Sequence, residues 1–190
     1  TCNTRFYLIS FLINMLNGSV TFLRKPEHSD AQFMLDIEND ERYWHLSGNT
    51  SPYTLQDIEQ FIDESSSNLE IDGQLQLVII DIATKNRAGL LDIFEYDSLH
   101  KRAGIGIFVA EEFRGKGLAF DALNTLIQYL FKVMDLHQLW CNVLADNDSS
   151  TNLFLKAGFK QTCIKKEWIF YNNCYHDEAL FQIINPYHSL

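Results

Sequence analysis

The chain has 190 residues, of which 46% are hydrophobic, and its formal net charge is −10. This length suits one domain with a core of its own, and the acidic balance argues against nucleic acid as a partner. The four cysteines lack the Cys-x-x-Cys spacing of zinc sites, and no apolar run is long enough to span a bilayer. We therefore expect a cytoplasmic protein with free thiols, no metal site and no membrane partner.

Residues 1–19 are expected to form an apolar N-terminal extension with no assigned role, ahead of a single domain over residues 20–190. Phe6 to Leu16 is nearly all apolar, about the length of a signal-peptide core, but Arg5 alone supplies positive charge beside it. Asn17-Gly18-Ser19 is a poor cleavage site. We expect the segment to pack on the domain or on a second copy of the chain, which makes a homodimer an expected assembly.

The first predicted elements are a strand, two helices and the loop between the helices. Val20 to Arg24 has a strand pattern, and apolar residues at helical spacing follow from Ala31 to Ile37. Asp40 to Tyr53 is rich in polar, aromatic and turn-forming residues, which predicts a loop. Thr54, with Asp57 three residues later, forms a capping-box pattern that begins the second helix.

The middle of the chain predicts a β-hairpin, a third strand and a long helix. Leu75 to Ile82 and Gly89 to Tyr96 are β-rich apolar runs, and Arg102 to Val109 is the next strand. From Leu118 to Phe131, apolar residues recur at helical spacing. Strands and a helix in this order favour an α/β fold.

The C-terminal part predicts a strand, a short helix and a final hairpin. Leu139 to Leu144 is the strand, and the helix after it ends at Ala157. Phe159 to Tyr171 and Tyr175 to Ile184 form the hairpin, which turns at Asn172-Asn173. Together the elements predict one α/β domain with a mixed sheet.

The turn Glu112-Phe113-Arg114-Gly115-Lys116-Gly117-Leu118-Ala119 joins the third strand to the long helix. The first backbone N–H groups of a helix have no intrahelical partners, and the helix dipole adds positive charge there. Glycines let the backbone approach a phosphate, and Arg114 and Lys116 add formal charge. The spacing matches neither the P-loop nor the dinucleotide fingerprint. The turn therefore predicts a site for a phosphorylated cofactor.

Two motifs in succession carry a family resemblance. Arg114-x-x-Gly117-x-Ala119 resembles the pyrophosphate loop of the GNAT superfamily of acetyl-CoA-dependent N-acetyltransferases. Asn142 to Ser150, followed by Leu153 to Phe159, resembles the second signature of that family, in the family's order and separation. The resemblance implies a GNAT fold, with a mixed, mostly antiparallel sheet of about seven strands flanked by about four helices.

Further segments resemble the RimJ/RimL branch of the family, within which the chain is similar to bacterial spermidine and diamine acetyltransferases. These segments are Leu23-Arg24 with Asp30, Glu38-Asn39-Asp40, His100-Lys101-Arg102-Ala103, and Lys166-Glu167-Trp168 with Tyr175, Asp177 and Glu178. The similarity covers about Val20 to Asn185.

The resemblance assigns acetyl-CoA to the glycine turn and its surroundings. It implies that the strand backbone at Phe108 and Val109 pairs with the pantetheine arm, and that an N–H there stabilises the oxyanion. It also implies that Asn147 hydrogen-bonds the pantetheine amide, although a helix N-cap is the alternative for this residue. Phe154 stands where many GNAT enzymes place a tyrosine that protonates the departing thiolate, so this donor is missing. The cofactor-binding residues implied are Phe108, Val109, Phe113, Arg114, Gly115, Lys116, Gly117, Leu118, Ala119, Asn147 and Phe154.

The acceptor amine needs a base, because an alkyl ammonium has a pKa near ~10.4. Resemblance to the polyamine enzymes singles out Asp92 and Glu95 as catalytic candidates, with Glu95 expected as base or relay. Their odd separation puts them on opposite faces of a strand unless a bulge intervenes. The expected substrate-binding residues are Glu38, Glu41, Tyr43 and Trp44, where carboxylates and aromatic rings could hold a cation.

We therefore expect an acetyl-CoA-dependent N-acetyltransferase acting on a small cationic amine, such as a polyamine or an amino-acid-like acceptor. Two alternatives stay open at this point. One is an enzyme that acetylates the N-terminal amine of a protein, which predicts an open groove instead of an enclosed acidic pocket. The other is a weakly catalytic CoA-binding sensor or interaction module that has lost the acid at the Phe154 position.

Overall fold

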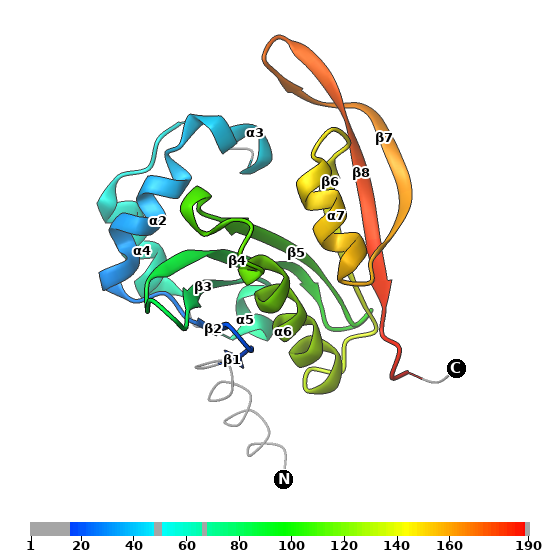
Figure 1. The fold of residues 1–190 in the computed structure, drawn as a ribbon, viewed down its shortest axis with the longest axis horizontal. Helices are drawn as coiled ribbons and strands as arrows, with labels where there is room; N and C mark the ends of the chain where they lie inside the picture. Colours follow the sequence, from blue (N-terminus) through cyan, green and yellow to red (C-terminus); the bar gives the residue numbers. More distant parts are fainter. Residues whose placement is uncertain (1–15, 48–50, 66–67, 189–190) are drawn as a thin grey trace.

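A computed structural model describes residues 16–47, 51–65 and 68–188. Most of the predicted N-terminal extension, residues 1–15, lies outside these ranges. Within them the chain folds as an open sheet with helices on both faces (Figure 1).

An eight-stranded sheet in the order β1-β2-β3-β4-β5-β6-β8-β7 runs through the described residues. Neighbouring strands are antiparallel except β5 and β6, which are parallel. The expected mixed, mostly antiparallel sheet is confirmed with one additional strand, because residues 16–17 of the predicted extension pair with β2. The strands are β1 Leu16–Asn17, β2 Thr21–Arg24, β3 Leu75–Asp81, β4 Arg87–Asp97, β5 Arg102–Val109, β6 Gln138–Leu144, β7 Lys160–Tyr171 and β8 Cys174–Ile184.

The described residues form more helices than the expected four, and the four longer ones are α2 Ala31–Glu38, α4 Leu55–Glu64, α6 Leu118–Lys132 and α7 Asp148–Lys156. The shorter helical segments are η1 His28–Asp30, η2 Glu41–Tyr43, α3 Trp44–Ser47, α5 Leu69–Asp72 and η3 Glu111–Phe113. The predicted capping box is confirmed, since Thr54 and Asp57 exchange side-chain and backbone hydrogen bonds at the start of α4. Among the described helices, none has the length and apolar character needed to cross a membrane.

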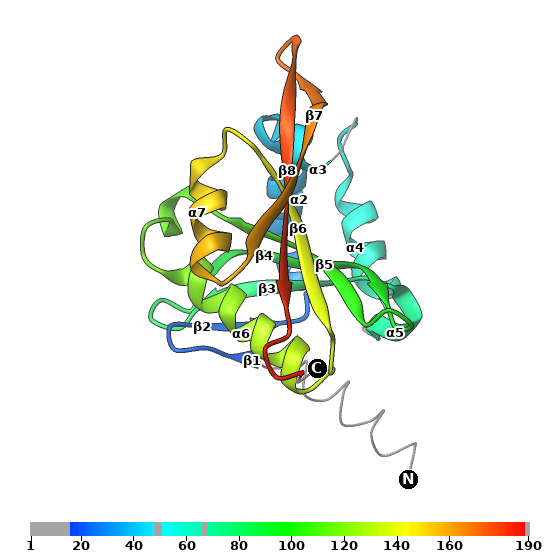
Figure 2. The same ribbon diagram turned by 90° about the vertical axis from the view of Figure 1, so that its right-hand side faces the viewer.

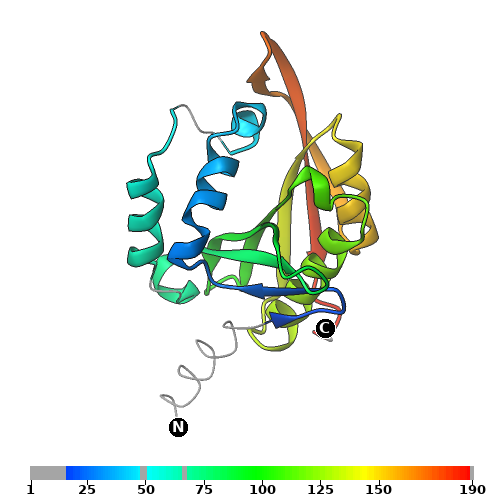
Figure 3. The ribbon, with the colours of Figure 1, turned by 60° about the vertical axis from the view of Figure 1, so that its left-hand side comes forward.

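The core has two layers because the central strands are buried on both faces. Val78 and Leu90 pack with Met34 of α2 in one cluster. Their neighbours Leu77 and Leu91 point to the opposite face, where a larger cluster includes α6. Figures 2 and 3 show α2 and α4 on one face of the sheet and α6 and α7 on the other. Burial on both faces explains why β3 and β4 read as near-continuous apolar runs.

The parallel strands β5 and β6 diverge within the sheet. Their paired residues run only from Arg102 with Gln138 to Gly104 with Trp140, although both strands continue beyond that point. The ring of Phe94 lies over Gly104, and a Cβ atom at this position would stand 2.3 Å from that ring. The glycine therefore admits an aromatic ring at the point of divergence, and the two strands leave a gap between them.

The predicted loop from Asp40 to Tyr53 was wrong in its described first half, which forms η2 and α3. The carboxylate of Asp40 accepts the N–H of Arg42 and so caps η2. The indole N–H of Trp44 donates to the carbonyl of Glu38, 2.8 Å away. Side-chain contacts hold these short helices, which lack the apolar repeat by which helices are recognised in a sequence.

Two aspartates tie the N-terminal strands to the rest of the domain. Asp30 is fully buried and accepts hydrogen bonds from Arg24 of β2, at 2.5 Å, and from Arg87 of β4. Asp121, in the first turn of α6, accepts the backbone N–H groups of Ser19, Val20 and Thr21, each at 2.9 Å. The negative charge of Asp121 also suits the positive end of the helix dipole.

Candidate active site

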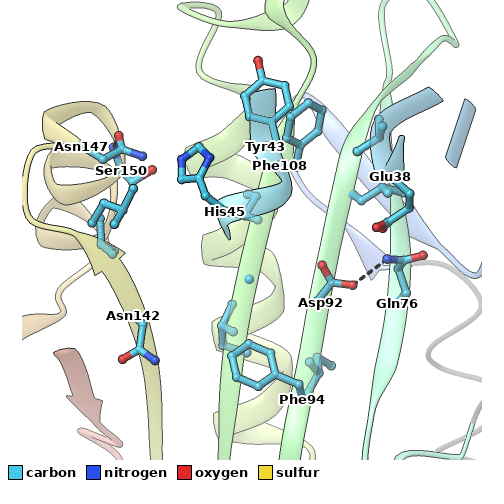
Figure 4. A pocket seen from close by; sticks show the side chains of 18 of the residues that line it. Glu38, Tyr43, His45, Gln76, Asp92, Phe94, Phe108, Asn142, Asn147 and Ser150 are labelled. Atoms are coloured by element: carbon cyan, nitrogen blue, oxygen red, sulfur yellow. Dashed lines mark hydrogen bonds between the residues drawn. The ribbon is translucent and has the colours of Figure 1, made fainter. Parts of the chain in front are cut away.

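A cavity of about 630 Å³ opens where β5 and β6 diverge (Figure 4). It reaches from the first turn of α7 to the strands β3 and β4. Figure 4 shows Gln76, Asp92 and Glu38 on one side of it and Asn142, Asn147 and Ser150 on the other. The lining side chains with polar or aromatic groups are Glu38, Tyr43, Trp44, His45, Phe61, Gln74, Gln76, Asp92, Phe94, Phe108, Asn142, Asn147, Ser150, Phe154 and Glu178.

Asp92 is the carboxylate at the centre of the strand side of the cavity. Its partner across the antiparallel pair β3–β4 is Gln76, whose Nε2 donates to Asp92 Oδ1 at 2.8 Å. Burial raises the pKa of Asp92 to about 6, against the lowering effect of the Gln76 hydrogen bond and with a further rise from the nearby Glu38 charge. A carboxyl group with a pKa in this range can exchange protons near neutral pH.

The charge of the cavity wall is negative. Glu38, Asp92 and Glu178 line it, and no lysine or arginine is among its described lining residues. Glu178 forms an ion pair with Lys165 at 2.7 Å, which offsets part of its charge. Glu38 and Asp92 lie on the side away from this pair, so the strand side of the cavity is suited to a cation.

Aromatic rings surround the mouth of the cavity. Tyr43 packs edge-on against Phe108 with their centroids 5.0 Å apart, which joins η2 to β5. Trp44 and His45 of α3 also line the cavity. Burial, together with the nearby His176, lowers the pKa of His45 below its usual value, so its ring favours the neutral form. Ring faces beside carboxylates can hold an ammonium group.

The glycine turn lies between β5 and α6 as expected. Gly115 and Gly117 have φ angles of 72° and 82°, and a Cβ atom at either would meet nothing within 4 Å. Their backbone conformation therefore favours glycine, and it faces open space. The guanidinium of Arg114 donates to the Val109 carbonyl at 2.9 Å and to the Tyr43 hydroxyl at 3.1 Å, so the turn contacts the aromatic mouth.

The expected cofactor residues divide between the cavity and the turn. Phe108, Asn147 and Phe154 line the cavity, whereas Val109 and Phe113 to Ala119 do not. Asn147 is the N-cap of α7, its Oδ1 accepting the N–H of Ser150 at 3.0 Å. Asn147 therefore caps a helix that begins at the cavity. Phe154, one turn further, is buried and packs edge-on against Phe159.

The expected acceptor residues are also divided. Asp92, Glu38, Tyr43 and Trp44 line the cavity. Glu41 is exposed on η2 and does not line the cavity. Glu95 is exposed as well, with a φ angle of 47° where the β4–β5 register shifts, and it is not part of the lining.

Sequence reasoning missed Gln76, Asn142 and Ser150 as lining residues. Only strand register reveals Gln76, since it stands directly opposite Asp92. Asn142 and Ser150 lie inside the second family signature, so that motif could have indicated them as site residues. Glu178 also lines the cavity, although the sequence indicated only its resemblance to the family and no role in the site.

Comparisons with known proteins agree with this geometry. Residues 21–160 match the model of the acetyltransferase (GNAT) domain family. The spermidine N(1)-acetyltransferase of Vibrio cholerae is 27% identical over 172 residues, 89% of this chain and 95% of that protein.

Solved structures with the same fold include spermidine N-acetyltransferase from Vibrio cholerae in complex with CoA and spermine. Its TM-score is 0.79 at 24% identity, with 88% of this chain and 96% of that chain covered. A dodecameric structure of the enzyme from the same organism has a TM-score of 0.73 at 26% identity, covering 88% and 95%. Because the family model matches most of its length, the chain belongs to the GNAT acetyltransferase family.

Proposed function

We propose that this chain transfers the acetyl group of acetyl-CoA to a primary amine of a polyamine. The observation that carries the proposal is the cavity between β5 and β6, which has Asp92 and Glu38 on one wall and no lysine or arginine among its described lining residues. Two carboxylates on one wall suit an acceptor with several positive charges, whereas a protein N-terminus carries a single ammonium group. The similarity to a spermidine N(1)-acetyltransferase supports the same acceptor class.

The turn from Phe113 to Ala119 is our proposed pyrophosphate site. Its two glycines hold a left-handed backbone that faces open space, and it lies at the start of a 15-residue helix. Acetyl-CoA, when bound, supplies the thioester. The pantetheine arm would run along Phe108 and Val109, on the part of β5 that has no paired residue on β6 in the described structure. Asn147 would hold an amide of this arm.

Proton transfer from the amine is assigned to Asp92 in place of Glu95. Asp92 lines the cavity and its pKa is raised to about 6, so at neutral pH it is ionised and can accept a proton directly or through a water molecule. Before that step its negative charge, with Glu38, holds the ammonium form. A backbone N–H near Val109 is the proposed donor to the oxyanion.

Two wider assignments accompany this proposal. Residues 20–190 are proposed as one catalytic unit of the RimJ/RimL-like branch. A homo-oligomer is also proposed, supported by the dodecameric relative and by exposed apolar side chains on the edge hairpin, Ile164, Trp168, Phe170 and Tyr175. Light scattering with multi-angle detection tests the assembly.

The function is tested by thiol release from acetyl-CoA with spermidine, spermine, a diamine, an amino acid and a peptide bearing a free N-terminus. We expect the polyamines to give kcat/KM values at least ~10-fold above the peptide. Asp92→Asn is expected to lower kcat/KM for spermidine by ~100-fold, the lower end of general-base effects. Asp36→Asn is the matched control, since Asp36 is exposed on α2 two residues before Glu38. CoA binding without turnover of any amine would overturn the proposal. A higher kcat/KM for the peptide than for the polyamines would overturn the polyamine assignment and make a protein N-terminus the acceptor.

A further inference from the structure

A cysteine, a histidine and an aspartate converge outside the cavity, at the tip of the β7–β8 hairpin. The sulfur of Cys174 lies 2.9 Å from Nε2 of His176, and Nδ1 of His176 lies 3.3 Å from Oδ2 of Asp146. Cys174 and His176 are two residues apart on β8, so both side chains stand on one face of the strand. Asp146 comes from the turn between β6 and α7. The hairpin turn at Asn172 and Asn173, both with positive φ, brings the start of β8 to this position.

This order of atoms is the one that activates a thiol. An imidazole nitrogen hydrogen-bonded to sulfur can take its proton and leave a thiolate, which is the nucleophilic form of cysteine. A carboxylate at the other ring nitrogen holds the imidazole in orientation. The sulfur also lies 3.6 Å from the carbonyl of Tyr171 and is exposed, so a small electrophile can reach it.

We propose that Cys174 is a reactive thiol site that forms mixed disulfides with low-molecular-weight disulfides. The Cys174 thiolate attacks one sulfur of the small disulfide, the S–S bond of that molecule breaks, and a new S–S bond forms to Cys174. The departing thiolate carries away the electron pair and takes the proton held by His176. Cys174 is thereby oxidised and one half of the small disulfide is reduced.

The site is joined to the mouth of the proposed acceptor cavity by stacked rings. His176 stacks on Tyr171 at 3.8 Å between centroids, and Tyr171 stacks on His45 at 4.1 Å. His45 lines the cavity. An adduct on Cys174 must displace the sulfur from His176, and the stack gives this change a path to α3. This second part rests on the proposed function, because it concerns access of the amine.

Cys163 provides a matched control. It is exposed on β7 of the same hairpin, and among the described residues no histidine is hydrogen-bonded to its sulfur. Cys141 is buried, which raises the pKa of its thiol and keeps it protonated. All variants carry Cys2→Ser, because Cys2 lies outside the described residues. Adding Cys163→Ser leaves Cys174 as the reporting thiol, and adding Cys174→Ser leaves Cys163.

The test measures reaction with an aromatic disulfide whose released thiolate absorbs visible light, with the modified residue identified by mass spectrometry. An ordinary cysteine is only a few per cent thiolate at pH 7. Activation of the sulfur by the His176 imidazole 2.9 Å away therefore predicts that Cys174 reacts ~10-fold faster than Cys163. His176→Asn is expected to bring Cys174 to the Cys163 rate, and in denaturant the two rates should agree. Equal rates in the folded protein, or no effect of His176→Asn in a folded variant, would overturn the proposal.

The coupling is tested with glutathione disulfide as the modifying reagent. The KM for spermidine is expected to change several-fold on modification and to return with dithiothreitol, while the Cys174→Ser variant stays constant. An unchanged KM in a fully modified protein would overturn the path through Tyr171. The labelling rates need no acetyl transfer, so they stand apart from the test of the proposed function.

Discussion

Gln76 donates a 2.8 Å hydrogen bond to Asp92, its direct partner across β3 and β4. The bond favours the charged carboxylate, while burial favours the neutral acid, and burial dominates because the pKa of Asp92 is raised to about 6. Asp92 is thus protonated below about pH 6 and ionised above it. The contact between Gln76 and Asp92 therefore helps to set the pH above which the proposed base can accept a proton.

Removal of this hydrogen bond tests the assignment. The kcat/KM of the natural chain for spermidine is expected to rise with pH through about 6, as Asp92 loses its proton. Gln76→Met removes the hydrogen bond that, among the described residues, lowers the pKa of Asp92, so the rise should move to higher pH. Gln60→Met, exposed on α4, is the control and should leave the profile in place. An unmoved profile in the Gln76 variant would take Asp92 out of the proton transfer.

Asp30 is expected to govern stability in acid. Burial would raise its pKa, but hydrogen bonds from Arg24, Arg87 and the Glu27 N–H lower it to about 2. Because the folded pKa lies below the unfolded value near ~3.9, its contribution is complete above about pH 4 and is lost as the pH falls toward 2.

Asp30→Asn should therefore lower the free energy of unfolding by about 3 kcal/mol at neutral pH, since it leaves two arginines without their buried partner. The difference between natural chain and variant should shrink between pH 4 and 2, a comparison that cancels contributions from other carboxylates. Urea unfolding at several pH values measures it, with exposed Asp36→Asn as the control. A difference that stays constant with pH would contradict the role of the Asp30 charge.

Local patterns were sufficient for most elements of the fold. The capping box at Thr54 and Asp57, the apolar spacing of α6 and the turn at Asn172 and Asn173 each depend on residues close together in the chain. Such features were predicted to within one or two residues. The α3 helix was missed because contacts such as the Trp44 bond to Glu38 form it without an apolar stripe.

The candidate site was predicted less completely because it depends on contacts between distant segments. Strand alternation places Asp92 and Glu95 on opposite faces, and the register shift after Phe94 leaves Glu95 exposed with a positive φ. The sequence alone does not tell on which face of the sheet the residues next to a bulge will lie. The cluster of Cys174, His176 and Asp146 could not be found either, since Asp146 reaches His176 from another element.

The left-handed conformation of Gly117 gives a prediction about cofactor binding. Alanine at a φ of 82° is strained by about 1–2 kcal/mol, and the backbone N–H groups at the start of α6 shift to relieve it. Gly117→Ala should therefore raise the KM for acetyl-CoA by ~10-fold. Gly73→Ala is the matched control, because Gly73 has a φ of 68° with nothing within 4 Å but ends α5. If Gly117→Ala and Gly73→Ala raise the KM for acetyl-CoA equally, general destabilisation of the fold causes the rise.

Asn147 has two candidate roles that substitutions can separate. Its Oδ1 caps α7 through the Ser150 N–H, while its amide nitrogen is proposed to hold the cofactor. Asn147→Ser keeps a capping oxygen and removes the amide, so only the KM for acetyl-CoA should rise. Asn147→Ala removes both and should also cost about 1 kcal/mol of stability. If the serine variant matches the natural chain in KM, capping is the whole role of Asn147.

Phe154 gives a prediction of increased activity. The residue is on α7, lines the cavity and packs edge-on against Phe159, so a hydroxyl at its ring tip would lie between the cavity and the core. If the ring tip faces the sulfur of the thioester, Phe154→Tyr supplies the missing proton donor and kcat should rise by ~10-fold or more. Phe159→Tyr is the control, because Phe159 is buried outside the cavity lining and its hydroxyl would only destabilise the core.

The two variants are compared by kcat at saturating acetyl-CoA and by melting temperature. A higher kcat with an unchanged melting temperature for Phe154→Tyr would show that the natural chain works without a tyrosine acid at this position and gains from one. A lower melting temperature with no gain in kcat would place the ring tip in the core. In that case the departing thiolate, a weak base with a pKa near ~8.5, leaves without help from this helix.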